Sequence, residues 1–247
     1  MKKIFKKRII ILLLIIFLLA ISVLFNLCGK REWVYNVGDE VVLGQYFSDE
    51  NDIFRSKGLE WIVIRATEDT VTLITKDIID WEYYSQNEYQ IQSRHIWKES
   101  DLRNWLNYDF YTNSIEFDRS LEVIGIKQSF YTQNNSEKNF YDNICLLKTS
   151  DIKDGEEWLK AKPTPYAIGK GAITSEDGFS SWWLMPESND TMVGYVDIDG
   201  EIKYEKLKNK NGIFQYGDVK HGVRPIIIVS QEYWQKVPLG KVKVRAD

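Results

Sequence analysis

The chain has 247 residues, with 32 lysines and arginines against 36 aspartates and glutamates, a formal net charge of −4. Seven of the cations and none of the anions lie in residues 1–31, which leaves 25 cations, 36 anions and a net charge of −11 for the rest. This acidic balance argues against binding to nucleic acid or tight adhesion to anionic lipid, because both depend on cationic contacts.

An apolar stretch over residues 9–28 predicts one transmembrane helix. About 20 residues at ~1.5 Å each span a ~30 Å hydrocarbon core. Five cations lie in residues 1–8, while only Lys30 and Arg31 follow closely. The positive-inside rule therefore predicts a cytoplasmic basic segment at 1–8 and a domain outside the cell membrane. A cleaved signal peptide and a lipoprotein modified at Cys28 are alternatives that place the domain on the same side.

After a spacer at 29–36, residues 37–247 are predicted to form one extracytoplasmic globular domain. Its first part is typical of β-structure, with strands expected at 37–44, 59–64 and 70–75 and a hairpin turn at Glu68-Asp69.

Helical periodicity follows. Ser100 is expected to cap a helix whose apolar positions run from Leu102 to Phe110, and a second short helix is expected over 113–121.

The middle of the domain is expected to alternate between strand and helix. Residues 144–148 are predicted to form a buried strand. Its Cys145 has no cysteine partner in the domain and is expected to be an inert core thiol. Ser150 is expected to cap a helix that runs to Leu159. Thr164-Pro165 is a helix-start pair.

The C-terminal part is β again. Asp199-Gly200 is a strong hairpin signal between strands at 194–198 and 201–204. A last strand is expected over 223–229, with Pro225 implying an edge position or a bulge. Hairpins with a few helices between them indicate the α+β class.

Three blocks of residues carry a family resemblance. They are Val37-Gly38-Asp39 with Trp61-Ile62-Val63; Trp97 with 102–107 and Phe110; and a C-terminal set of 163–167, Gly171-Ala172, Trp182-Trp183-Leu184, Asp199-Gly200 and Gly222-Val223-Arg224-Pro225. In order and spacing these blocks resemble a bacterial family, the domain of unknown function 6273, over about residues 36–230.

The resemblance implies a C-type-lectin-like fold of mixed antiparallel β-structure, as in formylglycine-generating enzymes and hypervariable ligand-binding proteins. It also implies that Arg224 belongs to a strand that closes the core, where we expect it to pair with a carboxylate. The family pattern continues Trp-Trp-Leu with Arg-Ser-Pro, whereas this chain has Met185-Pro186-Glu187. Fold alone does not fix function.

Catalytic motifs are not evident in the sequence. The formylglycine-generating relatives use two cysteines, but the domain has only Cys145. His95 and His221 lack metal-ligand spacing, and no phosphate loop or nucleophile elbow is present. The sequence therefore predicts no catalytic residue, metal or cofactor, although an enzyme on this fold remains the second alternative.

The predicted ligand site comprises Trp182, Trp183, Glu187, Asn189 and Asp190. Adjacent side chains in an extended segment face opposite ways, so one indole is expected in the core and the other at the surface. An exposed indole beside polar groups is typical of a glycan site. The alternative is that both indoles belong to the core. The three polar residues suit calcium by type, but their spacing does not match the lectin motif.

The function predicted from these features is non-catalytic recognition of a ligand, such as a glycan or an envelope fragment, at the bacterial cell surface. A structural or protein–protein module of the envelope is the first alternative.

Overall fold

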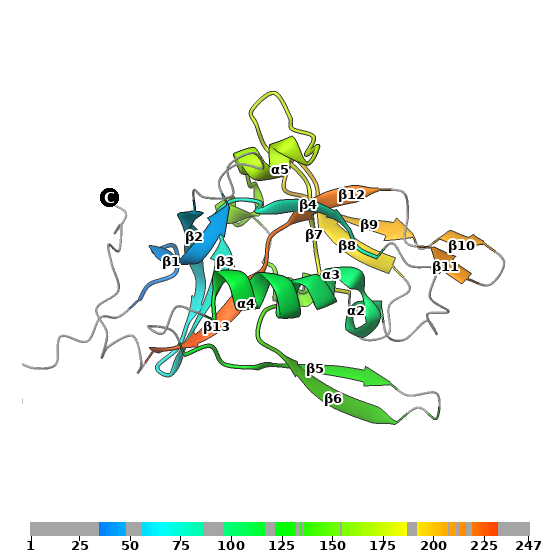
Figure 1. Ribbon diagram of the computed structural model, residues 1–247, viewed down its shortest axis with the longest axis horizontal. Helices are drawn as coiled ribbons and strands as arrows, with labels where there is room; N and C mark the ends of the chain where they lie inside the picture. The colour runs from blue at the N-terminus through cyan, green and yellow to red at the C-terminus, as the bar shows by residue number, and fades with distance from the viewer. Residues whose placement is uncertain are drawn as a thin grey trace, which may run out of the picture. The chain divides into compact units, whose positions relative to one another are not determined.

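The computed structural model describes residues 35–47, 56–85, 96–116, 122–131, 134, 136–153, 155–186, 192–206, 208–210, 213–215 and 219–231. The described elements belong to one compact unit that begins at Tyr35 (Figure 1). Within these ranges no helix is long and apolar enough to cross a membrane, and the apolar segment 9–28 lies outside them.

The fold is α+β, as predicted, and its strands pair mostly antiparallel. The strands are β1 (Glu40–Phe47), β2 (Ser56–Ala66), β3 (Thr70–Thr75), β4 (Asp80–Tyr83), β5 (Ile126–Tyr131), β6 (Glu137–Asp142), β7 (Trp182–Trp183), β8 (Met192–Val196), β9 (Ile202–Lys206), β10 (Lys208–Lys210), β11 (Ile213–Gln215), β12 (Lys220–Val223) and β13 (Ile226–Ser230). The helical elements are α2 (Ile96–Glu99), α3 (Asp101–Asn104), η1 (Trp105–Phe110), α4 (Tyr111–Ser114), η2 (Thr149–Asp151), η3 (Glu157–Leu159) and α5 (Pro165–Gly169).

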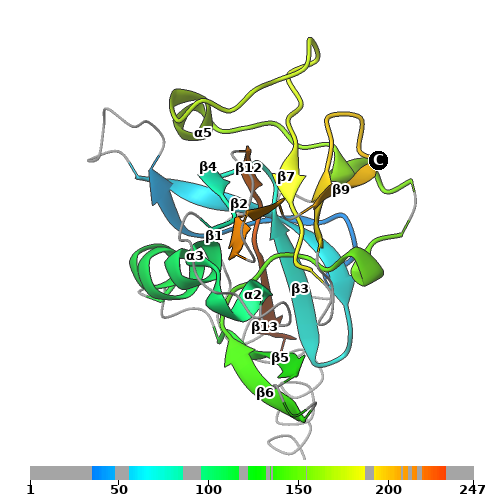
Figure 2. The ribbon, with the colours of Figure 1, turned by 90° about the vertical axis from the view of Figure 1, so that its right-hand side faces the viewer.

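Two sheets share the core. One has the strand order β1-β2-β3-β13, and the other has the order β4-β12-β7-β8-β9, while β5-β6 and β10-β11 form two-stranded ribbons. Figure 2 shows β12 and β13 as consecutive parts of one path that passes between the sheets. Trp61 and Trp182 are fully buried, one on a strand of each sheet.

The sheets are joined where two neighbouring segments bend together. β3 pairs with β13 in the first sheet, and their continuations β4 and β12 pair in the second, both antiparallel. Across the bend the amide of Thr75 donates to the carbonyl of Pro225 at 3.1 Å, and that of Ile79 donates to the carbonyl of Val223 at 2.9 Å. Backbone hydrogen bonding therefore continues from one sheet to the other.

Pro225 explains the main correction in the C-terminal part. The single strand expected over 223–229 is two strands in two sheets, because proline has no amide hydrogen to donate at the bend. β13 ends the strand order of its sheet, but isolated bridges from Val123 and Cys145 pair with its outer side, so the predicted edge position is confirmed only in the strand order.

Other strong local signals gave correct elements. β3 has the predicted bounds, and Thr164 caps α5 by accepting from the amide of Ala167 at 3.2 Å. The β8–β9 hairpin turns at Asp199-Gly200, where Gly200 has a φ of 84° that favours glycine.

The helix capped by Ser100 is also confirmed. The Ser100 hydroxyl accepts from the amide of Arg103 at 3.1 Å, and the helical path runs from α3 through the π-helical η1 to α4. The second helix expected over 113–121 is wrong at its start, because Ser114 ends this same helical path. Residues 117–121 lie outside the described ranges.

Residues 144–148 form an extended segment with isolated bridges and no regular strand. Cys145 bridges Ile226 and Lys148 bridges Met185. Asn107 of η1 takes up neighbouring backbone groups, accepting from the amide of Asn143 at 3.0 Å and donating to the carbonyl of Ile144 at 2.9 Å. The segment is thus anchored by a helix side chain as well as by a strand.

The helix expected from Ser150 to Leu159 is replaced by two short 3-10 turns, η2 and η3. Gly155 lies between them with a φ of 81°, outside the right-handed helical region. The segment therefore passes over the first sheet as a loop.

Gly222 is required where β12 meets the start of β7. A Cβ at this position would lie 2.4 Å from Cγ2 of Ile78 and 2.7 Å from the carbonyl oxygen of Ser181. Neither the Ser181 backbone nor the packed Ile78 side chain has room to move away, so β12 and β7 could not keep their present spacing.

We predict that Gly222→Ala lowers the free energy of unfolding by about 1–3 kcal/mol through overpacking. Gly125→Ala is the matched control, because its Cβ would lie 3.5 Å from the nearest atom, which is ordinary contact distance. Urea unfolding of the two full-length variants beside the wild type measures the difference. Equal losses in both variants would contradict the assigned packing.

Candidate functional site

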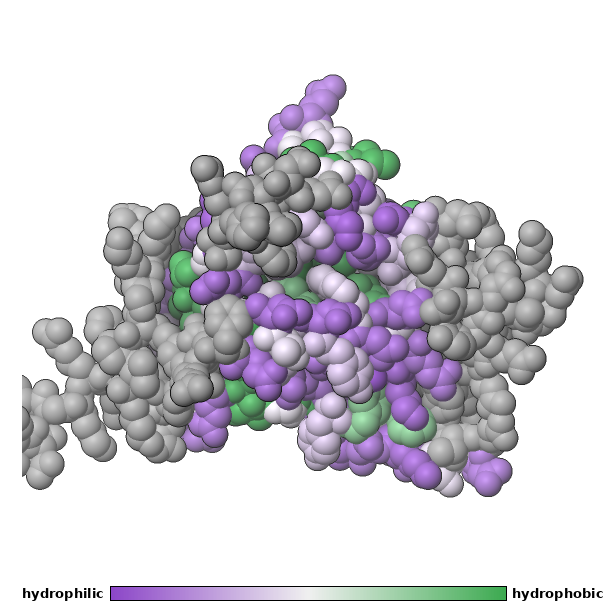
Figure 3. Space-filling view, in the orientation of Figure 1, coloured by the Kyte–Doolittle hydropathy of each residue, from purple (hydrophilic) through white to green (hydrophobic). Residues whose placement is uncertain are grey.

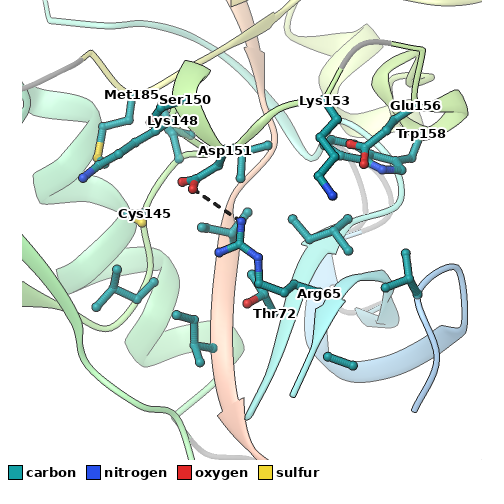
Figure 4. Close-up of a pocket in the computed structure, with 18 of the residues that line it drawn as sticks. Arg65, Thr72, Cys145, Lys148, Ser150, Asp151, Lys153, Glu156, Trp158 and Met185 are labelled. Atoms are coloured by element: carbon teal, nitrogen blue, oxygen red, sulfur yellow. Dashed lines mark hydrogen bonds and ion pairs between the residues drawn. The ribbon is translucent and has the colours of Figure 1, made fainter.

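A cleft of about 460 Å³ lies between the first sheet and the loop that contains η2 and η3. β2, β3 and β13 contribute residues on one side, and residues 145–158 contribute them on the other. Figure 4 shows that Arg65, Asp151, Lys153, Glu156 and Trp158 surround the opening. The cleft therefore combines charged groups with one aromatic ring.

Arg65 enters the cleft from an irregularity in β2. The register between β2 and β3 shifts between Val63 and Arg65, a bulge that changes where the following side chain points. The guanidinium meets Asp151 with Nη2 3.4 Å from Oδ1, and the Arg65 side chain is 58% exposed. A single long contact at an exposed side chain contributes little stability and leaves most guanidinium donors available.

Glu156 and Trp158 form the opposite wall. Trp158 is half-buried, so one part of its indole borders the cleft. Oε2 of Glu156 is buried and has no hydrogen-bond partner within the described part of the chain. Such an acceptor is uncommon in folded proteins, where buried polar atoms are normally satisfied.

Two lysines border the same cleft but point differently. In Figure 4 the amine of Lys153 points into the space between Arg65 and Glu156, whereas the amine of Lys148 extends away from Arg65. Lys153 is exposed, and no ion pair to it is found among the described residues. It is therefore available to a ligand.

The floor of the cleft includes the apolar side chains of Cys145, Met185 and Ile226, together with the buried polar side chains of Thr72 and Gln128. Burial raises the pKa of the Cys145 thiol far above its ordinary value, so the thiol stays protonated and poorly nucleophilic. The predicted core position of this cysteine is confirmed. Met185 occupies the position at which the family pattern implies arginine, and that position borders the cleft.

Arg224 holds the Trp158 wall in place. Its fully buried guanidinium donates to the carbonyls of Thr75 at 2.7 Å, Lys76 at 3.2 Å and Trp158. The core position expected for Arg224 is confirmed. The expected direct pairing with a carboxylate is not found among the described residues, because three backbone carbonyls take the donors, although the nearby carboxylate of Asp77 interacts with the guanidinium through its charge.

The expectation of one exposed indole at Trp182-Trp183 is wrong. Both are buried, with exposures of 0% and 3%. Nε1 of Trp182 donates to the carbonyl of Leu159 at 2.9 Å, and Nε1 of Trp183 donates to that of Glu82 at 2.8 Å. β7 lies between β12 and β8 in its sheet, and because neighbouring side chains point to opposite faces, the burial of both indoles shows that each face is covered here. Neither indole presents a free face for stacking.

The polar members of the predicted ligand site, Glu187, Asn189 and Asp190, lie outside the described residues. His95 does also. Within the described ranges no group of three or more His, Cys, Asp or Glu side chains is placed to hold a metal ion.

His221 belongs to a buried aromatic cluster on the second sheet. Its ring stacks on Tyr195 with centroids 4.1 Å apart and meets Trp183 edge-on at 4.3 Å. Nδ1 lies 2.6 Å from the Ser181 hydroxyl, and Nε2 lies 4.0 Å from Oε1 of Glu205. Burial lowers the pKa of His221 to about 4, so the ring is neutral at pH 7.

The cleft residues were not identified from the sequence. Arg65 and Trp158 are 93 positions apart, and neither lies in a recognisable motif. One signal was available. Asp154-Gly155 is a dipeptide typical of turns, and it argues against the helix expected from Ser150 to Leu159, the segment that contains Glu156 and Trp158.

We predict that acid destabilises the domain partly through His221. The ordinary pKa of about 6.5 applies to the unfolded chain, and the folded value is about 4. The unfolded state therefore binds more protons as the pH falls, and stability present above pH ~6.5 is lost toward pH ~4. Between pH 7 and 4.5 wild type should lose about 2–3 kcal/mol more than His221→Gln.

Urea unfolding of both proteins at the two pH values tests this difference. Because each protein is compared with itself, a lower starting stability of the variant does not affect the result. Identical losses in wild type and variant would contradict the role of His221.

Comparison with known proteins gives a family and no closer relative. No curated protein and no solved structure matches the chain. Residues 69–231, more than half of the chain, match one family. The match covers the strands from β3 to β13 and most of the cleft, but it leaves out Arg65 and the other cleft residues that precede residue 69. The chain belongs to the family described as a domain of unknown function, DUF6273.

Proposed function

We propose that the domain binds a small polar ligand, such as a glycan or an envelope fragment, in the cleft between Arg65 and Trp158, without catalysing a reaction. One observation carries this proposal. A half-buried indole faces charged side chains across a hollow of about 460 Å³. Small-molecule sites have this makeup, with an apolar surface for contact and a few polar groups for orientation.

The proposed site does not include the two buried indoles of β7, but the polar residues that follow β7 in the sequence remain part of the proposal. Met185 borders the cleft, and Glu187, Asn189 and Asp190 follow it within five positions. The three residues lie outside the described ranges, and their polar side chains suit ligand contacts by type. They remain candidates for ligand contacts.

We also propose that residues 9–28 anchor the chain in the cell membrane with the domain outside. The support is the apolar length and the charge asymmetry around it. A C-type-lectin-like fold is proposed for the domain as well. The feature that favours it is the closing position of Gly222-Val223-Arg224-Pro225, where the chain passes between the two sheets.

We predict that at least one member of a panel of saccharides and cell-wall fragments raises the melting temperature of the full-length chain. A ligand at ~100 times its dissociation constant adds about 2.7 kcal/mol. Trp158→Leu should abolish most of that shift, because it removes the aromatic wall. Repeating the series with calcium and with a chelator tests Glu187, Asn189 and Asp190.

Trp105→Leu is the matched control, since Trp105 is also half-buried but lies on η1, away from the cleft. Equal shifts in the two variants would place binding elsewhere. No shift with any compound, together with co-purification of a stoichiometric protein, would favour an interaction module of the envelope instead.

A further inference from the structure

The charges of the cleft are not evenly distributed. Of its two carboxylates, Asp151 meets Arg65, whereas Oε2 of Glu156 is buried and unsatisfied within the described part of the chain. Leaving a buried acceptor without a donor costs free energy. Glu156 also makes no ion pair within the described part of the chain, so a ligand ammonium group at its carboxylate would pair with a charge that no described cation neutralises.

The cationic side chains of the cleft, in contrast, suit an anionic group of a ligand. Arg65 makes one contact of 3.4 Å with Asp151, and the amine of Lys153 points into the hollow (Figure 4). No ion pair within 4.0 Å joins Lys153 to Glu156, although both are described. A ligand carboxylate would suit this side, because arginine binds carboxylates through paired hydrogen bonds and lysine adds a second cation.

The apolar parts lie between and beneath these charges. Met185 and Ile226 are buried in the floor, and Trp158 supplies a wall. The volume of about 460 Å³ is at the small end of the range for ligand pockets. A cleft of this size and composition suits a molecule as small as a short peptide, with an apolar side chain and one charged group at each end.

We infer that the cleft recognises a short peptide with free termini, which is a small zwitterion. The ammonium group of the peptide meets Glu156, and its carboxylate meets Arg65 and Lys153. This inference rests on the proposed function, since it names the ligand class of the same cleft. The indole of Trp158 contacts the apolar side chain of the peptide.

The test uses the dipeptide alanyl-leucine and three blocked forms: N-acetylated, C-amidated, and blocked at both ends. Calorimetric titration into the full-length chain measures the four dissociation constants. The free dipeptide should bind at least tenfold more tightly than either singly blocked form, and the doubly blocked form should bind most weakly. Equal affinity for all four, or no binding of the free dipeptide, overturns the inference.

Two variants assign each end of the peptide. Glu156→Gln should weaken the free dipeptide at least tenfold but leave the N-acetylated form unchanged, because that form has no ammonium group to lose. Lys153→Gln should weaken the free dipeptide but not the C-amidated form. Glu137→Gln and Lys127→Gln are the controls, because both side chains are exposed on the β5–β6 ribbon and outside the cleft.

Failure here is distinguishable from failure of the proposed function. If neutral saccharides bind in a Trp158-dependent way while the dipeptide does not, the cleft is a ligand site of another class and the zwitterion is wrong. If neither class binds, both proposals fall. Loss of binding in a control variant as large as in its partner also overturns the assignment of the two ends.

Discussion

The buried guanidinium of Arg224 is the interaction on which the rest of this domain depends. It lies at the bend where β12 becomes β13, and it donates to carbonyls of Thr75 and Lys76 on the neighbouring bend between β3 and β4. The indoles of Trp158 and Trp182 flank it, with ring centroids 5.8 Å and 5.1 Å from its central carbon. A buried cation needs its donors satisfied, and at a bend the strand carbonyls are free to satisfy them. Arg224 therefore ties both sheets to one point through hydrogen bonds to backbone carbonyls, with the charge of Asp77 nearby.

The same side chain links the core to the cleft. Its remaining hydrogen bond goes to the carbonyl of Trp158, so the backbone of the cleft wall is held from inside the domain. Gly222, two residues earlier, permits the close approach of Ser181 that brings β7 beside β12. Beyond β7, Met185 continues to the cleft floor, where its amide donates to the carbonyl of Leu147 at 2.8 Å. The Gly222-to-Pro225 segment thus assembles the site without contributing a charge to it. Figure 3 shows that the described part of one face is mostly hydrophilic.

The sequence was sufficient where a local rule decides the structure. The bounds of β3, the caps at Ser100 and Thr164 and the turn at Gly200 each follow from residues within a few positions of one another. It was insufficient where distant partners decide. The apolar run after Val223 does not reveal that its two halves belong to different sheets, and alternation at Trp182-Trp183 does not reveal that both faces of β7 are covered. The cleft was beyond reach for the same reason, since β2, β13 and the loop before Leu159 meet only in the folded chain.

Burial separates the reactive side chains of this domain from those that keep their charge. Within the described residues, Cys145 and His221 are the obvious candidates for nucleophilic or acid–base chemistry, and burial holds both uncharged at neutral pH. The ring of His221 is further fixed between Tyr195 and Trp183, so it acts as a packed member of the core. Arg65 and Lys153 instead lie exposed at the mouth of a hollow that Glu156 also borders. Charged side chains around a hollow can orient a ligand and favour ligands whose charges are complementary to theirs. The burial of Cys145 and His221 and the exposed cations at the cleft are therefore consistent with the proposed binding function, in which charged side chains at an opening orient a ligand.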